Sequence, residues 1–346
     1  MFVQRYSRCA PQTPAFFPSW YIYHMNQKEN FLRILRFDHP ERVICHLPAY
    51  SLHYFGMNHE GFDGGGDDCQ VGSRWTDIWG TGWHKIHAGV MGLPEVCPLA
   101  EIENLPDYTW PDPNDPRLTQ TIDDLARAFP GGDCLLAGSH RDTLWEKAYM
   151  LVGMENMMMY FLSEPAFARE VLHRIMDFQL GIARHYLKLG VEMVFLGDDL
   201  GTQQGPLLGP RIVRAFLEPE YRRLFDLYRQ HGVLIGFHSC GNVASVVEMF
   251  MDLGVNLLNP VQASANDLDR LRSITHGRMA LQGGVSSATL MEGPPEQIVA
   301  EAHQRMLQLG QQGGYVCQPD QGMPYPPGNL QVLYDAVESL GRYPLR

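Results

Sequence analysis

Over most of its length the chain alternates short apolar segments with longer amphipathic ones. The apolar segments have the length of buried strands. The segments between them repeat their apolar positions every three to four residues, as helices packed on one side do. Such an alternation predicts a parallel sheet whose two faces are covered by helices. The predicted strands cover residues 41–50, 132–140, 191–201, 233–241, 255–262, 279–285 and 313–320.

The length of this series decides between two kinds of parallel sheet. Seven strands in one unbroken series favour a closed (β/α)8 TIM barrel over an open sheet, with an eighth strand expected in the early part of the chain. An amphipathic helix is predicted over residues 26–36, with Phe31, Leu32 and Leu35 facing inward. We therefore expect the α/β class and a single barrel over residues 26–346.

The segment at about 50–95 does not follow the barrel pattern. It is rich in Gly, Asp and Trp, which predicts an inserted excursion with a hairpin around Gly80. Its tryptophans at 75, 79 and 83 form either a lid with an aromatic wall over the barrel mouth or the core of a small hairpin layer.

Nearly every predicted strand ends in polar residues or glycine. In a TIM barrel the carboxyl ends of the strands share one face, and catalytic residues gather there. Polar side chains at these ends are therefore candidate substrate contacts, although loops are often polar for other reasons. The candidates are His140, Asn259, Gln262, Gln282 and Gln321.

One strand ends in a pair of metal-binding side chains, His238 and Cys240, followed by Gly241. Residues two apart on a strand face the same side, so both side chains can point to one spot. Imidazole and thiolate together suit zinc, and Cys317, near the end of the last predicted strand, is a candidate third ligand. The alternative is that His238 and Cys240 only pack in the core, where free cysteines are common.

Two adjacent acids, Asp198 and Asp199, end another apolar strand. Neighbouring strand residues point in opposite directions, so only one of the two can face the barrel axis. That residue is a candidate metal ligand, a partner that holds His238, or a catalytic proton-transfer group. The alternative role is that of a helix-capping aspartate.

Composition narrows the possible partners and the location of the protein. The 346 residues carry a net charge of −12, which argues against binding to nucleic acid or to an anionic membrane surface. No apolar stretch approaches the roughly 20 residues of a membrane-spanning helix. Seven scattered cysteines argue against a disulfide scaffold and predict a cytoplasmic protein. Residues 1–25 are expected to be an N-terminal extension, with Met25 as an alternative start.

Several segments, in this order, resemble the uroporphyrinogen decarboxylase superfamily over residues 26–343. They include "GDDLGTQQGPLLGPRIVRAFLEPEYRRLFD", "GFHSCGNV", "VNLLNPVQ", "LQGGV" and "GGYVCQPDQGMPYPPGNLQVLYDA". The resemblance implies a (β/α)8 barrel. Its zinc branch contains cobalamin-dependent methyltransferases of the methylcobalamin:coenzyme M type, which bind zinc through His-x-Cys and a distant Cys. His238 and Cys240 match that motif. Cys317 matches the third ligand by spacing, whereas Gln321 occupies its slot by local context.

The resemblance implies a zinc-dependent methyltransferase that moves a methyl group between a corrinoid (cobalamin) and a thiol or small methylated compound. The implied partners are a separate corrinoid protein and a small-molecule methyl donor or acceptor, and Asp198 and Asp199 are the candidate catalytic residues. One alternative is a decarboxylase acting on a carboxylated tetrapyrrole or small acid, although the arginine-rich N-terminal segment of true uroporphyrinogen decarboxylases is missing. The other is a non-catalytic corrinoid or metal carrier.

Overall fold

The computed structural model describes residues 25–346, so the expected extension lies outside the described residues except for Met25. Its main sheet is parallel, and the strands follow one another around it in chain order. They are β1 (Ala49–Leu52), β5 (Leu135–His140), β6 (Met193–Gly197), β7 (Leu234–His238), β8 (Leu257–Val261), β9 (Ala280–Val285) and β10 (Tyr315–Pro319).

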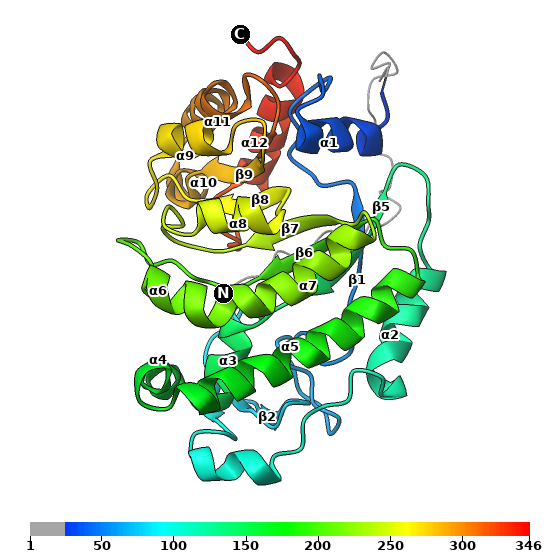
Figure 1. Cartoon of the computed structure of the whole chain (residues 1–346). Coiled ribbons are helices and arrows are strands. Elements are labelled where there is room, and N and C mark those ends of the chain that lie inside the picture. The colour runs from blue at the N-terminus through cyan, green and yellow to red at the C-terminus, as the bar shows by residue number, and fades with distance from the viewer. Residues whose placement is uncertain (1–24) are drawn as a thin grey trace.

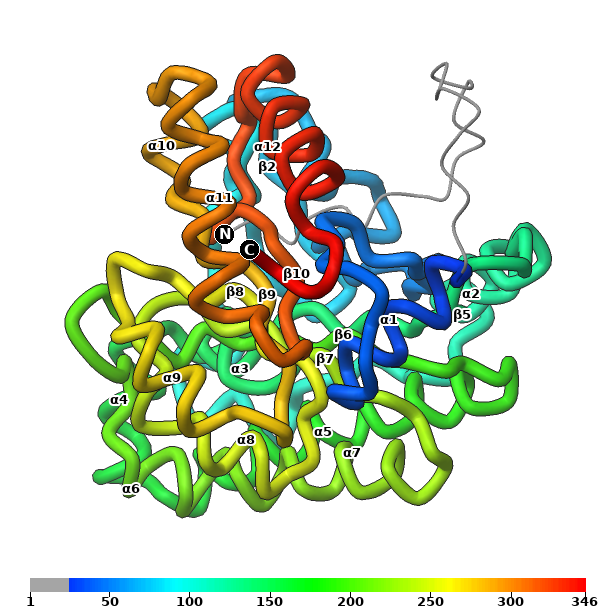
Figure 2. Tube along the Cα trace, turned by 90° about the horizontal axis from the view of Figure 1, so that it is seen from above, coloured from blue at the N-terminus to red at the C-terminus, as the bar shows by residue number. Residues whose placement is uncertain are grey.

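The two edges of this sheet meet near the start of the chain. Ile44, shortly before β1, forms a parallel bridge with Val316 in β10, and its carbonyl accepts the Cys317 N–H at 2.9 Å. Figure 2 shows the early segment around α1 lying next to β10. The predicted TIM-barrel fold is confirmed, and residues 25–346 supply seven regular strands where eight were expected.

Helices cover the outside of the sheet. The long helices α5 and α7 lie side by side against it (Figure 1). A 3-10 helix covers Ile102–Asp107, and a π-helical turn covers Val213–Leu217. The α-helices are α1 (Gln27–Arg36), α2 (Pro116–Arg127), α3 (Trp145–Val152), α4 (Met154–Ser163), α5 (Pro165–Lys188), α6 (Pro210–Ile212), α7 (Glu218–Gln230), α8 (Val247–Leu253), α9 (Leu268–Thr275), α10 (Ser287–Glu292), α11 (Pro295–Gly310) and α12 (Pro327–Leu340).

Alternate residues of each strand belong to two separate apolar cores. The inner core fills the barrel, and Phe31, Ile34 and Leu35 of α1 close its amino end; among its strand residues are Leu135, Ala137, Met193, Phe195, Leu257, Ala280 and Val316. The outer core lies between the sheet and the helices and takes the residues in between, such as Leu136, Val194, Leu196, Ile235, Phe237, Leu258 and Leu281. Both faces of the strands are therefore buried, which explains their continuous apolar sequences.

The first helix forms where the sequence predicts it. Asn26 precedes it, and its side chain accepts the Glu29 N–H at 2.7 Å, which satisfies one of the unpaired N–H groups of the first turn. Phe31 and Leu35 face inward as predicted, whereas Leu32 is only half-buried and Ile34 takes the third inward position.

The early region forms a separate antiparallel sheet instead of an eighth barrel strand. Its strands are β2 (Arg74–Thr76), β3 (Gly82–His84) and β4 (Leu93–Val96), and β2 and β3 form a hairpin around Gly80, whose φ of 76° suits glycine. Trp79 and Trp83 are each 1% exposed. Trp79 packs on Phe178 of α5 and Trp83 on His59, so both are core residues and not a wall for a ligand.

A buried charge cluster fixes this layer to the barrel. His59 is fully buried and lies between two carboxylates: its Nδ1 is 2.9 Å from Asp67, and its Nε2 is 2.7 Å from Asp142, which follows β5. Arg141 also donates to Asp67, and the His59 ring stacks on Trp83 with centroids 4.1 Å apart. The excursion is therefore anchored at the carboxyl end of β5.

The cysteines of the described residues differ in their bonding state. Cys134, directly before β5, is disulfide-bonded, whereas Cys45, Cys69, Cys97, Cys240 and Cys317 are free thiols, so no disulfide scaffold holds residues 25–346 together.

None of the helices in this part of the chain combines the length and the apolar character required to cross a membrane.

The anchor of the excursion is expected to fail in acid. Burial alone would raise the pKa of Asp67, but His59 and Arg141 lower it to about 2, below the ordinary 3.8. A carboxyl whose folded-state pKa is lowered stabilises the fold above its ordinary pKa, and this contribution disappears as the pH falls from about 4 to 2. It corresponds to about 2 kcal/mol. Urea unfolding between pH 2 and 5 should show a shallower pH dependence for Asp67→Asn, whereas the exposed Asp63→Asn should behave like the wild type. Equal slopes for all three proteins would contradict this assignment.

Candidate metal site at the carboxyl end of the barrel

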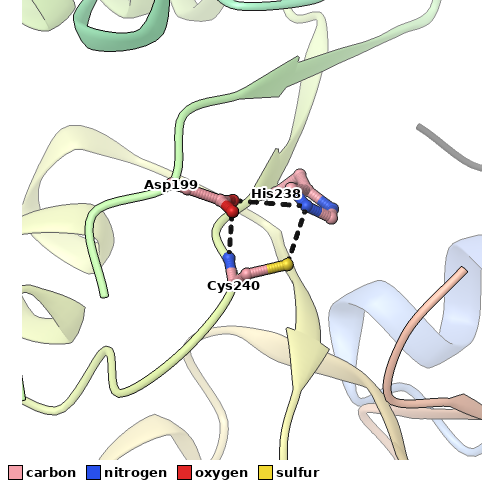
Figure 3. Close-up of side chains that lie close together, drawn as sticks. All are labelled: Asp199, His238 and Cys240. Atoms are coloured by element: carbon pink, nitrogen blue, oxygen red, sulfur yellow. Dashed lines mark hydrogen bonds and ion pairs between the residues drawn. The ribbon is translucent and has the colours of Figure 1, made fainter. Parts of the chain in front are cut away.

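Three potential metal ligands meet where β6 and β7 end. His238 is the last residue of β7, Cys240 follows it in the next turn, and Asp199 comes from the loop after β6 (Figure 3). The His238 Nε2 lies 3.3 Å from the Cys240 Sγ and 3.5 Å from an Asp199 carboxylate oxygen. One ligand atom from each residue lies within 4.8 Å of the others.

These separations fit a tetrahedral zinc ion. Zinc bonds of about 2.0–2.1 Å to nitrogen and oxygen and about 2.3 Å to sulfur place neighbouring ligand atoms about 3.4–3.6 Å apart. The two separations from His238 are close to that range. The side chains of His238 and Asp199 are 19% and 13% exposed, so the site can be reached from solvent. The residues present therefore suit zinc.

Glycines make this geometry possible at two points. Gly197 pairs with His238 across β6 and β7, and a Cβ on Gly197 would lie 3.2 Å from the His238 Cβ. Gly241 has a φ of 81°, and a Cβ there would come within 2.5 Å of the Gly201 backbone. The glycine after Cys240 thus lets the chain turn sharply against the β6 loop.

The neighbouring strand fixes the orientation of the histidine ring. The Nδ1 of His238 is 2.8 Å from the Asn259 Oδ1, at the paired position of β8. Because a carboxamide oxygen only accepts hydrogen bonds, Nδ1 donates to Asn259, which leaves Nε2 as the ring nitrogen that can bind a metal. Asn259, which the sequence proposed as a substrate contact, is placed to orient His238.

The electrostatics of the cluster favour a cation. Burial alone would lower the pKa of His238, but Cys240 and Asp199 raise it well above its ordinary value. The negative charge that favours a proton on this ring equally favours a metal ion. Asp199 also accepts the Cys240 N–H at 2.9 Å and so ties the two loops together.

The glutamines lie at different depths around this cluster. Gln262 accepts the Gly241 N–H at 2.7 Å and donates to the Asp320 carbonyl at 3.3 Å, so it links the loops after β7, β8 and β10. The Gln321 side-chain amide lies 3.8 Å from the Cys240 Sγ. Gln282 is fully buried inside the barrel and donates to Gln318 at 2.6 Å.

Asp198 faces away from the site. It is fully buried on the helix side of β6, and its carboxylate accepts the N–H groups of Leu144 and Glu146 and the hydroxyl of Tyr221 at 2.6–2.9 Å. Burial raises its pKa to about 7, although these hydrogen bonds act in the opposite direction. The prediction that only one acid faces the axis is therefore correct, and Asp199 is that residue. Asp198 caps the start of α3 and points away from the candidate metal ligands.

His140 is likewise directed toward the helices, which contradicts its predicted role in substrate binding. Its Nδ1 lies 2.7 Å from Gln179 in α5, and its Nε2 lies 2.5 Å from the Tyr228 hydroxyl in α7. Burial lowers its pKa to about 4, so it stays neutral near pH 7. Both ring nitrogens have partners within the outer core.

Cys317 is not placed to bind the same metal as Cys240. Val316 belongs to the inner core, so Cys317, the next residue of β10, faces outward and belongs to the outer core. Its sulfur lies 4.0 Å from the Ala302 carbonyl of α11, and burial raises its pKa to about 12. The predicted third ligand is therefore wrong, and the structure brings Asp199 to the pair in its place.

One buried acid near the site has no signal in the sequence. Glu146, in the first turn of α3, is 2% exposed and accepts a hydrogen bond from the Tyr149 hydroxyl at 3.3 Å. Burial, and then the charges of Asp142 and Asp199, raise its pKa well above the ordinary value. A glutamate in a helix usually faces solvent, so its type and position alone do not reveal it.

The chain belongs to the uroporphyrinogen decarboxylase (URO-D) family, whose model matches residues 94–340. Among solved structures, a methyltransferase from Methanosarcina mazei is similar, with a TM-score of 0.62, 17% identity, and coverage of 91% of this chain and 99% of that chain. A sugar phosphate isomerase/epimerase from Parabacteroides distasonis has a TM-score of 0.34 at 12% identity, covering 67% of this chain and 76% of that chain. A B12-independent methionine synthase from Shewanella sp. has a TM-score of 0.36 at 9% identity, covering 62% of this chain and 62% of that chain. No curated protein sequence matches the chain.

The two adjacent acids are expected to differ sharply on substitution. Asp198→Ala leaves two buried N–H groups and the Tyr221 hydroxyl without their acceptor, and should lower the free energy of unfolding by about 3 kcal/mol. Asp199→Ala should cost about 1 kcal/mol or less, because its partly exposed partner can bind water instead. Urea unfolding of the metal-free proteins measures both values. Equal losses would contradict the division of roles.

Proposed function

We propose that the chain is a zinc-dependent methyltransferase that moves a methyl group between a corrinoid, carried by a separate protein, and a thiol or small methylated compound. The cluster of Asp199, His238 and Cys240 at the barrel mouth carries the proposal. Membership of the URO-D family and the similarity to the structure of a Methanosarcina mazei methyltransferase support it.

The chemistry of the donor set suits this role. One thiolate and one carboxylate balance the charge of Zn²⁺, and the neutral imidazole adds a third ligand. When bound, zinc lowers the pKa of a substrate thiol and so makes the thiolate nucleophile available near pH 7. The protein itself keeps the His238 lone pair directed to the site through Asn259 and holds Cys240 through Asp199.

A decarboxylase acting on a carboxylated tetrapyrrole needs cations for the substrate carboxylates. Arg141, at the carboxyl end of β5, is buried and already paired with Asp67. Its charge is therefore used to anchor the excursion. This observation favours the methyltransferase over the decarboxylase.

Metal content tests the proposal. We expect about one zinc per chain in wild-type protein purified with zinc available, and less than a tenth of that in Cys240→Ala, because the softest ligand is lost. Cys317→Ala is the matched control and should retain its zinc, because that sulfur faces α11. Wild-type protein that holds no zinc would refute the mechanism, and loss of zinc from Cys317→Ala would refute the ligand assignment.

Turnover separates an enzyme from a carrier. With methylcobalamin and mercaptoethanol as probes, an enzyme should accelerate the loss of methylcobalamin absorbance above the rate without protein. Asp199→Ala should abolish this acceleration. A metal-loaded protein that binds methylcobalamin without turnover would support the carrier alternative instead.

A further inference from the structure

The side-chain amide of Gln321 is the polar group next to Cys240 that the proposed metal site does not yet use. Its Oε1 and its Nε2 both lie 3.8 Å from the Cys240 Sγ. Among the described residues this sulfur is its only hydrogen-bonding partner. Gln321 is half-buried in the loop after β10, so solvent and ligands can reach it.

The loop that carries Gln321 is held on two sides. The Gln321 carbonyl accepts the Tyr325 hydroxyl at 2.7 Å, and that hydroxyl is 2.6 Å from the Ser287 Oγ. Ser287 in turn donates to the Asp320 carboxylate at 2.6 Å, and Gln262 donates to the Asp320 carbonyl. The fold therefore fixes the backbone of Gln321 beside Cys240.

The 3.8 Å separation can be explained in two ways. It is near the limit for a weak N–H···S hydrogen bond. It also lies close to the separation of about 3.6 Å between a sulfur and an oxygen ligand on one tetrahedral zinc ion. Asp199, His238 and Cys240 can supply three ligands of such an ion, and the Gln321 amide lies beside one of them, Cys240.

We propose that the Gln321 Oε1 fills the fourth metal position in the resting protein and that the sulfur of a thiol substrate displaces it. This inference rests on the proposed function. An amide oxygen is a neutral and comparatively weak zinc ligand, whereas a thiolate is softer and charged, so the exchange favours the substrate. Asp199 and Cys240 already balance the ion, and the entering thiolate leaves the site with one net negative charge. The thiol proton passes to solvent.

Cobalt substitution of the full chain tests this exchange, because the visible bands of Co²⁺ report the number and type of its ligands. Wild-type protein should show a four-coordinate spectrum, and mercaptoethanol should add a sulfur-to-cobalt charge-transfer band. Gln321→Ala should bind metal about tenfold more weakly and show an altered spectrum before thiol is added. Gln321→Glu, which keeps an oxygen at this position, should restore the four-coordinate spectrum.

Two further variants complete the test. Gln321→Cys should show the additional charge-transfer band without mercaptoethanol, and the thiol should then change little. Gln204→Ala, an exposed glutamine in the β6–α6 loop, is the control and should match the wild type. Identical spectra and affinities for the wild type, Gln321→Ala and Gln321→Cys would overturn the role of Gln321 and leave the metal site intact. Wild-type protein that binds neither zinc nor cobalt would instead refute the proposed function, and this inference with it.

Discussion

The strict alternation of side chains at the carboxyl ends of the strands determines what each polar residue of this barrel can do. At the end of β6 the two adjacent acids face opposite sides, so Asp198 caps a helix while Asp199 meets His238 and Cys240. The same rule sends Cys317 toward α11. Chemical type alone does not separate these residues, because buried polar groups need partners on either face. The position of each residue in the alternation of its strand determines whether it faces the barrel axis or the helices.

The site concentrates negative charge in a partly buried place, which is costly unless a cation or a proton offsets it. The charges of Asp199 and Cys240 both raise the pKa of His238. The charge of Asp199 also helps to raise the pKa of Glu146. In contrast, the neighbouring cluster around His59 contains a permanent cation, because Arg141 forms an ion pair with Asp67. Among the described residues Asp199 forms an ion pair only with His238, so a metal ion bound there would offset its charge.

The sequence predicts the regular parts of this molecule well. Continuous apolar strands and amphipathic helices gave the TIM barrel, and the two-residue spacing placed His238 and Cys240 on one side of β7. The sequence pattern could not show which face of β10 carries Cys317. Cys317 and Gln321 are four residues apart, which would place them on one face of a continuous strand, but β10 ends at Pro319, and beyond that residue the chain no longer alternates. The predicted role of His140 was wrong for a related reason. A polar side chain at a strand end can find its hydrogen-bonding partners on the helix side as well as at the barrel axis.

Tertiary contacts that no local pattern encodes account for the rest of the site. Asp199 follows directly after Asp198, whose carboxylate is held by three donors from α3 and α7. A shift of Asp199 toward or away from His238 would have to strain these bonds, so the cap on α3 also limits the movement of the candidate ligand. The excursion is attached at Asp142, shortly before the same helix. The hydrogen bonds from the start of α3 to Asp198 thus join the segment that anchors the excursion to the loop that carries the candidate ligand Asp199. Such support keeps ligands in position before the metal arrives, which lowers the cost of ordering them on binding.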